Sequence, residues 1–186
     1  MKHTGFTLFE LLVTLSIAGI LSLLAWPAMT HFIAEYQLMV KSNQILGAVQ
    51  FARNQAVTYQ AVVTTCPSAG YTCSKEWNQG LLSFIDSNKD GRRQDSERLI
   101  NYLSLTELEA NLVLKKFGRE RYLQFLPNGR TRQVKQAGAF WICPFNNAFP
   151  VRAIKFNRQG RIWSGADRDH NGRLDNHSRA ETRCEN

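Results

Sequence analysis

Residues 1–29 read MKHTGFTLFELLVTLSIAGILSLLAWPAM. From Leu11 to Met29 it carries no charge, and its length is close to what a membrane-spanning helix needs. Glu10 stands at the edge of this apolar run. A carboxylate near the centre of a membrane helix costs about 2.5–3.5 kcal/mol, so an acid in such a segment is a functional-site hypothesis by default.

The residues around Glu10 suggest what that function is. An ordinary signal anchor is one reading, because Lys2 supplies a basic start, but Trp26 stands where a cleavable secretory signal has a small residue. The motif GFTLFELLVTLSIAGIL instead resembles, as a whole, the class III signal of type IV prepilins and type II secretion pseudopilins. The resemblance implies that a prepilin peptidase cuts between Gly5 and Phe6 and that the new N-terminal residue is methylated.

The same resemblance implies a role for Glu10. In the assembled filament its carboxylate is expected to meet the α-amino group of the neighbouring subunit's first residue. Pairing offsets the desolvation of both charges, whereas a missing partner leaves one charge buried and alone. Glu10 is therefore expected to select correctly docked subunits. Pro27 matches a proline that commonly breaks this helix in the family.

The next stretch, residues 31–59, predicts an amphipathic continuation of the helix, because apolar residues recur at helical spacing. Its end, LGAVQFARNQAV at residues 46–57, resembles the end of the half-helix in the GspH/FimT branch of the family, which includes FimU-like proteins. The apolar positions are Phe32, Tyr36, Met39, Val40, Leu46, Val49, Ala52 and Ala56.

Beyond residue 59 the pattern changes to short strands separated by turns. LQFLPNGRTR, residues 123–132, and IKFNRQGRI, residues 154–162, resemble the family's F-x-P-x-G element and its last hairpin. A helix followed by strands predicts an α+β fold class, and the resemblance implies that the long N-terminal helix packs on two small antiparallel sheets. The strand candidates are residues 61–66, 80–86, 97–105, 111–117, 121–129, 139–145 and 151–163.

Four parts of the chain follow from these patterns. We expect a cleaved leader over residues 1–5, a transmembrane and filament-core helix over residues 6–30, and its amphipathic continuation over residues 31–59. Residues 60–186 are expected to form a β-rich exported domain with a C-terminal tail tied down by a disulfide.

Four cysteines follow the apolar run, and an even number in an exported domain indicates two disulfides. Three pairings are open. We favour Cys66–Cys73, which closes the short loop CPSAGYTC, and Cys143–Cys184, which ties the polar tail to the domain. Free thiols and a zinc site are the alternatives, but Cys66 and Cys73 are too widely spaced for a CxxC pair.

A calcium site is a candidate in the loop DSNKDGRRQDSE, residues 86–97, which satisfies the pattern D-x-[DN]-x-[DN]-G-x₅-E. The oxygen ligands would come from Asp86, Asn88, Asp90 and Glu97. The flanks resemble strands and not EF-hand helices, so a hairpin without metal is the competing reading and the one we favour. A second loop, residues 167–178, begins in the same way but ends in Ser178 where the last acid belongs.

The charge balance makes DNA a candidate partner. Lys and Arg number 23 against 15 acids, which gives a net charge of +8, and basic stripes attract phosphates. In the FimT subset of the family, a G-R-x-R motif in the last hairpin is described as binding DNA. At the equivalent place, residues 160–163 read GRIW and match only the first arginine of the motif. The sequence GRTR does occur, but in the earlier hairpin, at residues 129–132. A solvated basic face, or pairing with neighbouring subunits or lipid head groups, is the alternative. If both hairpin ends converge, the candidate residues are Arg130, Arg132, Arg158 and Arg161.

No catalytic triad spacing or nucleophile elbow is visible, so we expect a protein that is not an enzyme but is the substrate of one. The first reading is a minor pilin of a type IV pilus that primes or tips the filament for twitching, adhesion or DNA uptake. The alternatives are a DNA-binding subunit for natural transformation, a GspH-like pseudopilin of type II secretion, and a calcium-binding adhesive module. Expected partners are other pilins, the prepilin peptidase, the inner membrane before assembly, and DNA. The domain is expected in the periplasm, and outside the cell once the pilus is assembled.

Overall fold

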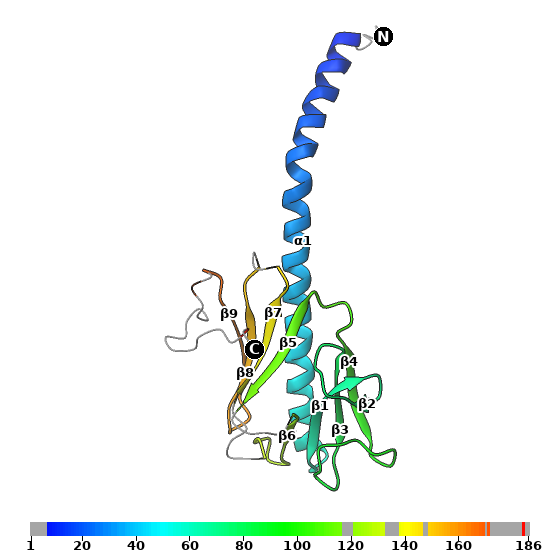
Figure 1. Ribbon diagram of the computed structural model, residues 1–186, viewed down its shortest axis with the longest axis vertical. Helices are drawn as coiled ribbons and strands as arrows, with labels where there is room; N and C mark the ends of the chain where they lie inside the picture. Colours follow the sequence, from blue (N-terminus) through cyan, green and yellow to red (C-terminus); the bar gives the residue numbers. More distant parts are fainter. Residues whose placement is uncertain are drawn as a thin grey trace, which may run out of the picture. The chain divides into compact units, whose positions relative to one another are not determined.

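The computed structural model describes residues 7–116, 121–132, 138–146, 149–169, 171 and 184. Its first element is α1, Leu8–Thr58, which is one helix of 51 residues (Figure 1). The assigned helix continues through Pro27, so the break suggested by the family's proline is not present. Within the described ranges, no helix combines the length and the apolar composition needed to cross a membrane. The membrane span over residues 6–30 therefore stays a prediction.

Both ends of α1 are capped by hydrogen bonds that the local sequence provides. Thr7 precedes the helix, and its Oγ1 accepts a hydrogen bond from the Glu10 amide at 3.2 Å, as in the first half of a capping box. At the other end the Ala61 amide donates to the Ala56 carbonyl and the Gln60 amide to the Val57 carbonyl, which is the Schellman arrangement. Gln60 takes a positive φ of 50° there, a position that usually holds glycine.

The chain divides into two units, Met1–Gln37 and Leu38–Asn186, with the boundary inside α1. Residues of α1 from Leu38 on therefore belong to the same unit as the strands. Their buried positions follow a helical spacing of three and four residues. Among the described residues they are Leu38, Ser42, Ile45, Ala48, Val49, Ala52 and Ala56.

The sequence predicted part of this face wrongly. Val49, Ala52 and Ala56 are buried as expected, but Phe32, Tyr36 and Met39 are exposed. Phe32 and Tyr36 belong to the first unit, whereas the buried helix positions all belong to the second. The predicted face starts too early because an apolar pattern on a helix does not show where its packing partner begins.

Two antiparallel sheets complete the second unit, and the second half of α1 runs alongside both (Figure 1). In the first sheet the order is β2-β1-β3-β4, with β6 paired to β1. In the second sheet the order is β5-β7-β8-β9. The strands are β1 Val63–Ala69, β2 Thr72–Cys73, β3 Gly80–Ile85, β4 Leu99–Ser104, β5 Ala110–Lys116, β6 Leu123–Phe125, β7 Gly138–Pro144, β8 Arg152–Phe156 and β9 Ile162–Ala166.

The α+β class, the long helix and the two antiparallel sheets are confirmed, and each predicted strand segment contains a strand. The sequence missed β2, which has only two residues. The second sheet places Phe140 on its inner face, where its ring lies 4.9 Å from that of Trp77 and 5.8 Å from that of Phe156, centroid to centroid. Trp77 comes from the loop before β3, so this aromatic cluster joins the two sheets.

Both preferred disulfides are confirmed. Cys66–Cys73 joins β1 to β2, and Cys143–Cys184 joins β7 to the C-terminal tail. The described part of the chain contains no free cysteine.

Candidate functional site

Two glycine turns of the same design lie at the ends of the predicted basic hairpins. In the first, the Gly129 amide donates to the Leu126 carbonyl at 2.8 Å. In the second, the Gly160 amide donates to the Asn157 carbonyl at 3.0 Å. Gly129 and Gly160 have φ values of 73° and 79°, which glycine adopts without the steric cost of a side chain.

The fold brings these two turns together and holds them against α1. The Thr131 amide donates to the Arg158 carbonyl at 3.2 Å, and Nε of Arg53 donates to the Gly129 carbonyl at 2.9 Å. A Cβ on Gly160 would overlap the Gly129 carbonyl oxygen, so the second glycine is needed for the close approach as well as for its φ. Convergence of the two hairpin ends, on which the DNA hypothesis depended, is therefore observed.

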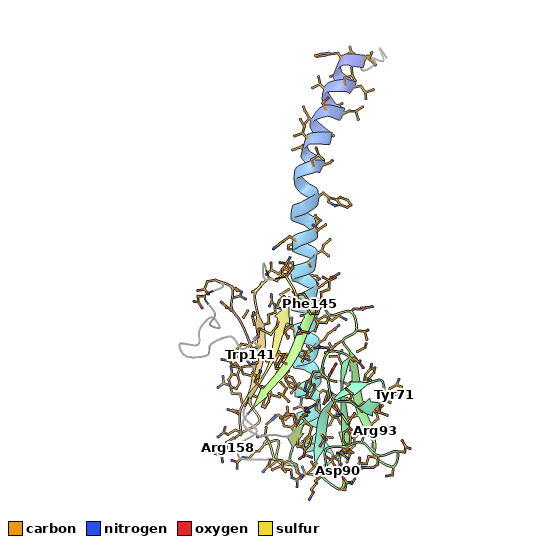
Figure 2. The ribbon with its side chains drawn as sticks, in the orientation of Figure 1. Tyr71, Asp90, Arg93, Trp141, Phe145 and Arg158 are labelled. Atoms are coloured by element: carbon orange, nitrogen blue, oxygen red, sulfur yellow. A yellow bond between two sulfur atoms is a disulfide. The ribbon has the colours of Figure 1, made fainter. Side chains whose placement is uncertain are left out.

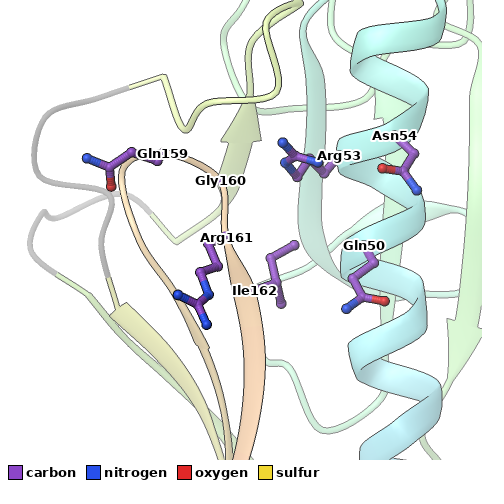
Figure 3. Close-up of a pocket in the computed structure, with 7 residues that line it drawn as sticks. All are labelled: Gln50, Arg53, Asn54, Gln159, Gly160, Arg161 and Ile162. Carbon is purple, nitrogen blue, oxygen red and sulfur yellow. The ribbon is translucent and has the colours of Figure 1, made fainter.

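A groove of about 390 Å³ opens beside the turns, and we call it the turn groove. Figure 3 shows Gln50, Arg53 and Asn54 on α1 opposite the last hairpin, which contributes Gln159, Gly160, Arg161 and Ile162. Side-chain amides and guanidinium groups dominate its lining, so it offers hydrogen-bond donors and positive charge to a polar, anionic ligand.

The four arginines predicted for DNA do not act alike. Arg130, Arg158 and Arg161 are exposed near the turns. Arg161 also lies over the ring of Trp163, with its guanidinium carbon 5.8 Å from the centroid, so this half-buried tryptophan shapes the arginine's position. Arg132 is directed elsewhere, toward the loop that follows β3.

Arg132 supports the acidic loop after β3. Its Nη1 donates to the Lys89 carbonyl at 2.7 Å and to Oε1 of Gln124 at 3.1 Å. Nε2 of Gln124 in turn donates to Oδ2 of Asp86 at 2.7 Å. The guanidinium therefore links a basic hairpin to the candidate calcium loop through hydrogen bonds to Lys89 and Gln124 of the same chain.

The candidate calcium loop is organised by hydrogen bonds around the fully buried Asp86. This carboxylate accepts bonds from the amides of Asp90 and Gly91, from the Thr64 hydroxyl at 2.5 Å, and from Gln124. Glu97, at the end of the loop, also holds the loop backbone, because its carboxylate accepts hydrogen bonds from the amides of Ser87 and Gln94. The two acids therefore close the loop from both sides.

The structure brings Asn88 beside Asp90, with Nδ2 of Asn88 donating to Oδ2 of Asp90 at 3.1 Å. Hydrogen bonding to Asp90, first of all from the Arg92 amide, holds the pKa of that carboxyl below its usual value. In the described part of the chain, no group of three or more His, Cys, Asp and Glu side chains is placed to hold a metal ion. Calcium binding by this loop stays the alternative to the metal-free hairpin that we favour from the sequence. Residues 170 and 172–178 of the second loop lie outside the described residues.

The processing motif is described only in part. Gly5 and Phe6 lie outside the described residues. Glu10 is exposed in the first turn of α1, where its amide is capped by Thr7. An acid in this turn is also favoured by the positive end of the helix dipole. Residues 7–10, T-L-F-E, therefore stabilise the start of α1, in addition to the contact with a neighbouring subunit that is expected of Glu10. This capping role was not predicted from the sequence.

The groove residues on α1 were missed from the sequence. Gln50, Arg53 and Asn54 fall inside a stretch that was interpreted only as the packed end of the helix. Arg53 could have been singled out, because it is a cation between the buried positions Ala52 and Ala56. Nothing in the sequence shows that its partner is the Gly129 carbonyl, 76 residues away.

Two family models match the chain. The one described as Type II transport protein GspH matches residues 41–160, and the prokaryotic N-terminal methylation motif matches residues 1–26. No protein with a curated description matches.

Solved structures share the fold. Two crystal forms of the type IV minor pilin FimU of Pseudomonas aeruginosa are similar, each at 18% identity. Their TM-scores are 0.55 and 0.53, over 71% and 69% of this chain and 90% and 96% of theirs. The minor pseudopilin EpsH from the Type 2 Secretion System of Vibrio cholerae is similar at 11% identity and a TM-score of 0.50, over 69% of this chain and 95% of its own.

Proposed function

The chain belongs to the GspH family and carries the N-terminal methylation motif, and on that premise we propose that it is a minor pilin that primes or tips a type IV pilus. Membership makes it a minor pilin or pseudopilin that is anchored in a membrane before it assembles with other pilins. The finer proposal is a single-pass protein of the inner membrane with its domain in the periplasm. The prepilin peptidase removes residues 1–5, and the domain leaves the cell in the assembled pilus.

The observation that carries this proposal is the methylation motif at residues 1–26 joined to a GspH domain at residues 41–160. Both parts also occur in type II secretion, so the experiment has to separate the two machines. Deleting the gene should reduce surface pili and leave secretion of exoproteins intact. Loss of secretion with normal piliation would instead place the chain in the secretion system.

Glu10 supplies the direct test of assembly. Glu10→Val removes the acid expected to pair with the α-amino group of a neighbouring subunit, and removing one partner leaves the other charge buried and unpaired. We expect insertion and leader cleavage to persist, and recovery of the chain in sheared pili to fall by about tenfold or more. Quantitative immunoblotting of sheared and membrane fractions measures this.

Thr14→Val is the matched control, because residue 14 lies four positions on, on the same side of α1, and its hydroxyl donates locally to the Leu11 carbonyl at 2.9 Å. This variant should assemble as wild type does. Normal recovery of Glu10→Val in the pili would show that the acid does not select docked subunits.

DNA capture is the second candidate function, and the convergence of the two glycine turns favours it. Arg130, Arg158 and Arg161 are exposed close together, beside the turn groove. DNA bound here would be held through its phosphates, because no helix among the described residues is placed to enter a groove of the duplex. Binding should then be insensitive to base sequence and fall steeply with salt.

The test is a fluorescence titration of the full chain in non-ionic detergent with a short labelled oligonucleotide at two salt concentrations. Arg158→Gln with Arg161→Gln should weaken binding and reduce the log–log salt slope by about 0.7–0.9 for each phosphate that is no longer neutralised. Lys115→Gln with Lys116→Gln removes the same charge from β5 and should do less. Equal weakening in the two double variants would mean that net charge alone attracts the DNA.

A further inference from the structure

A second and larger cavity lies at one edge of the first sheet. On this edge β6 pairs with Val63–Thr65 of β1, and β2 pairs with Ser68 and Ala69. Cys66 and Pro67 lie between these two short strands and line a cavity of about 790 Å³. That volume is within the range of protein ligand sites.

Cations from three separate loops converge on this space, and we call it the cationic cavity. Lys75 follows β2, Arg92 and Arg93 belong to the loop organised by Asp86, and Arg121 precedes β6. Asp90 is the one acid among its lining residues in the described chain. Figure 2 shows Asp90 and Arg93 beside the first sheet, with Arg158 at the hairpin end of the second sheet.

Within the described ranges, these four cations form no ion pair with a carboxylate. Asp90 acts through space on Arg92, but its own oxygens accept bonds from the Arg92 amide, Asn88 and Gln94. Arg93 donates from Nη1 to the Tyr71 carbonyl at 3.2 Å, and its Nε is buried with no hydrogen-bond partner in the described chain.

The walls of the cavity are fixed before any ligand arrives. Tyr122 packs its ring on Gly91, where a Cβ would overlap the ring. Cys73 is held to Cys66 by the disulfide, and both Cys73 and Tyr122 pack on the buried cluster that contains Leu82 and Phe84. A preorganised site loses less entropy on binding than one that must be assembled.

We propose that the cationic cavity is the docking site for an acidic segment of a different protein subunit in the filament complex. The proposal rests on the assembly function stated above and names the chemistry of the partner. Arginine guanidinium groups bind carboxylates in pairs of parallel hydrogen bonds, and three of the four cations are arginines. Aspartate and glutamate side chains on one loop would supply the missing counter-charges.

Two observations favour this occupant over the others. A second copy of this chain would bring its own net charge of +8 against the cations, so a different and acidic subunit is the better complement. A nucleic acid backbone is tracked by cations along an extended groove, whereas these cations line one cavity that also has a tyrosine and a disulfide in its walls.

The binding test uses a fluorescein-labelled peptide with a run of glutamates between Gly-Ser ends, titrated with the full chain in non-ionic detergent. Arg92→Gln with Arg121→Gln should weaken binding by about tenfold or more. The matched control is Arg158→Gln with Arg161→Gln, which removes the same charge at the turn groove and should change binding by about threefold at most. Equal weakening in both double variants, or none, would overturn the proposal.

Cross-linking in cells identifies the occupant. Thr72 is exposed and lines the cavity, so a photo-crosslinking amino acid at this position should join the chain to a pilin subunit of net negative charge. The adduct should disappear in the Arg92→Gln and Arg121→Gln background. Adducts formed only with a second copy of the chain, or protection of the site by added DNA, would contradict the assignment.

The outcomes for the cavity and for the proposed function are separable. If Glu10→Val abolishes assembly while the cavity variant binds the peptide and assembles normally, the cavity proposal is wrong and the assembly function stands. If deletion of the gene leaves pili unchanged, the assembly function is wrong, whatever the peptide does.

Discussion

Asp86 shows how one buried carboxylate organises a loop at the residue scale. Its two oxygens accept bonds from two backbone amides, a hydroxyl and a side-chain amide. Such charge-assisted bonds are stronger than neutral ones, and removing the carboxylate leaves several buried donors unpaired. The sequence pattern identified this loop correctly as a structured acidic turn. The pattern does not show whether the carboxylates accept hydrogen bonds from amides or bind calcium, because the same oxygen atoms can do either.

Asp86→Ala should therefore destabilise the fold by about 3 kcal/mol or more, since each buried donor left unpaired costs about 1–3 kcal/mol. Asp95→Ala, in the same loop but exposed, should cost less than about 0.5 kcal/mol. Urea unfolding of the full chain in detergent, followed by tryptophan fluorescence, measures both. Similar midpoints for the two variants would mean that the network around Asp86 contributes little.

Among the helices and strands, the long apolar strands were predicted from the sequence. A very short strand, and features that depend on contacts between distant segments, were not. β2 has two residues and owes its place to the hairpin that the Cys66–Cys73 disulfide closes. The inner face of α1 begins at Leu38, which only the position of the sheets determines. The stacking of the turns at Gly129 and Gly160 also depends on contacts between distant segments, so their sequences suggested turns and nothing about their neighbours.

Gly160→Ala tests that stacking. The added Cβ would meet the Gly129 carbonyl as well as a positive φ, so we expect a loss of about 2–4 kcal/mol, from backbone strain and overpacking together. Gly70→Ala is the matched control, because Gly70 also has a positive φ, of 71°, but nothing within 4 Å of an added Cβ. This variant should lose only about 1 kcal/mol of stability, because it adds backbone strain without overpacking. Equal losses of stability would show that the turns do not need to lie so close.

At the scale of the whole molecule, the fold class could be predicted but the sites could not. The change from helical to strand periodicity near residue 59 indicated a helix followed by strands, and the family resemblance implied two antiparallel sheets; the structure has the helix and both sheets. The pairing of β6 with β1, which creates the edge where the cationic cavity lies, joins segments about sixty residues apart. The sequence of either segment alone does not show that the two strands pair. The basic composition was visible, but its division between the turn groove and the cationic cavity required the structure.

If this chain is processed and assembled as a pilin, its mature N-terminus carries the chemical record of that processing. Intact-mass and N-terminal peptide analysis of the chain should be compared in cells with and without prepilin peptidase. We predict a chain that begins at Phe6 and carries one added methyl group when the peptidase is present, and an uncut chain when it is absent. In Gly5→Glu the chain should stay uncut in both. A chain that still begins at residue 1 in cells with active peptidase would contradict the assignment.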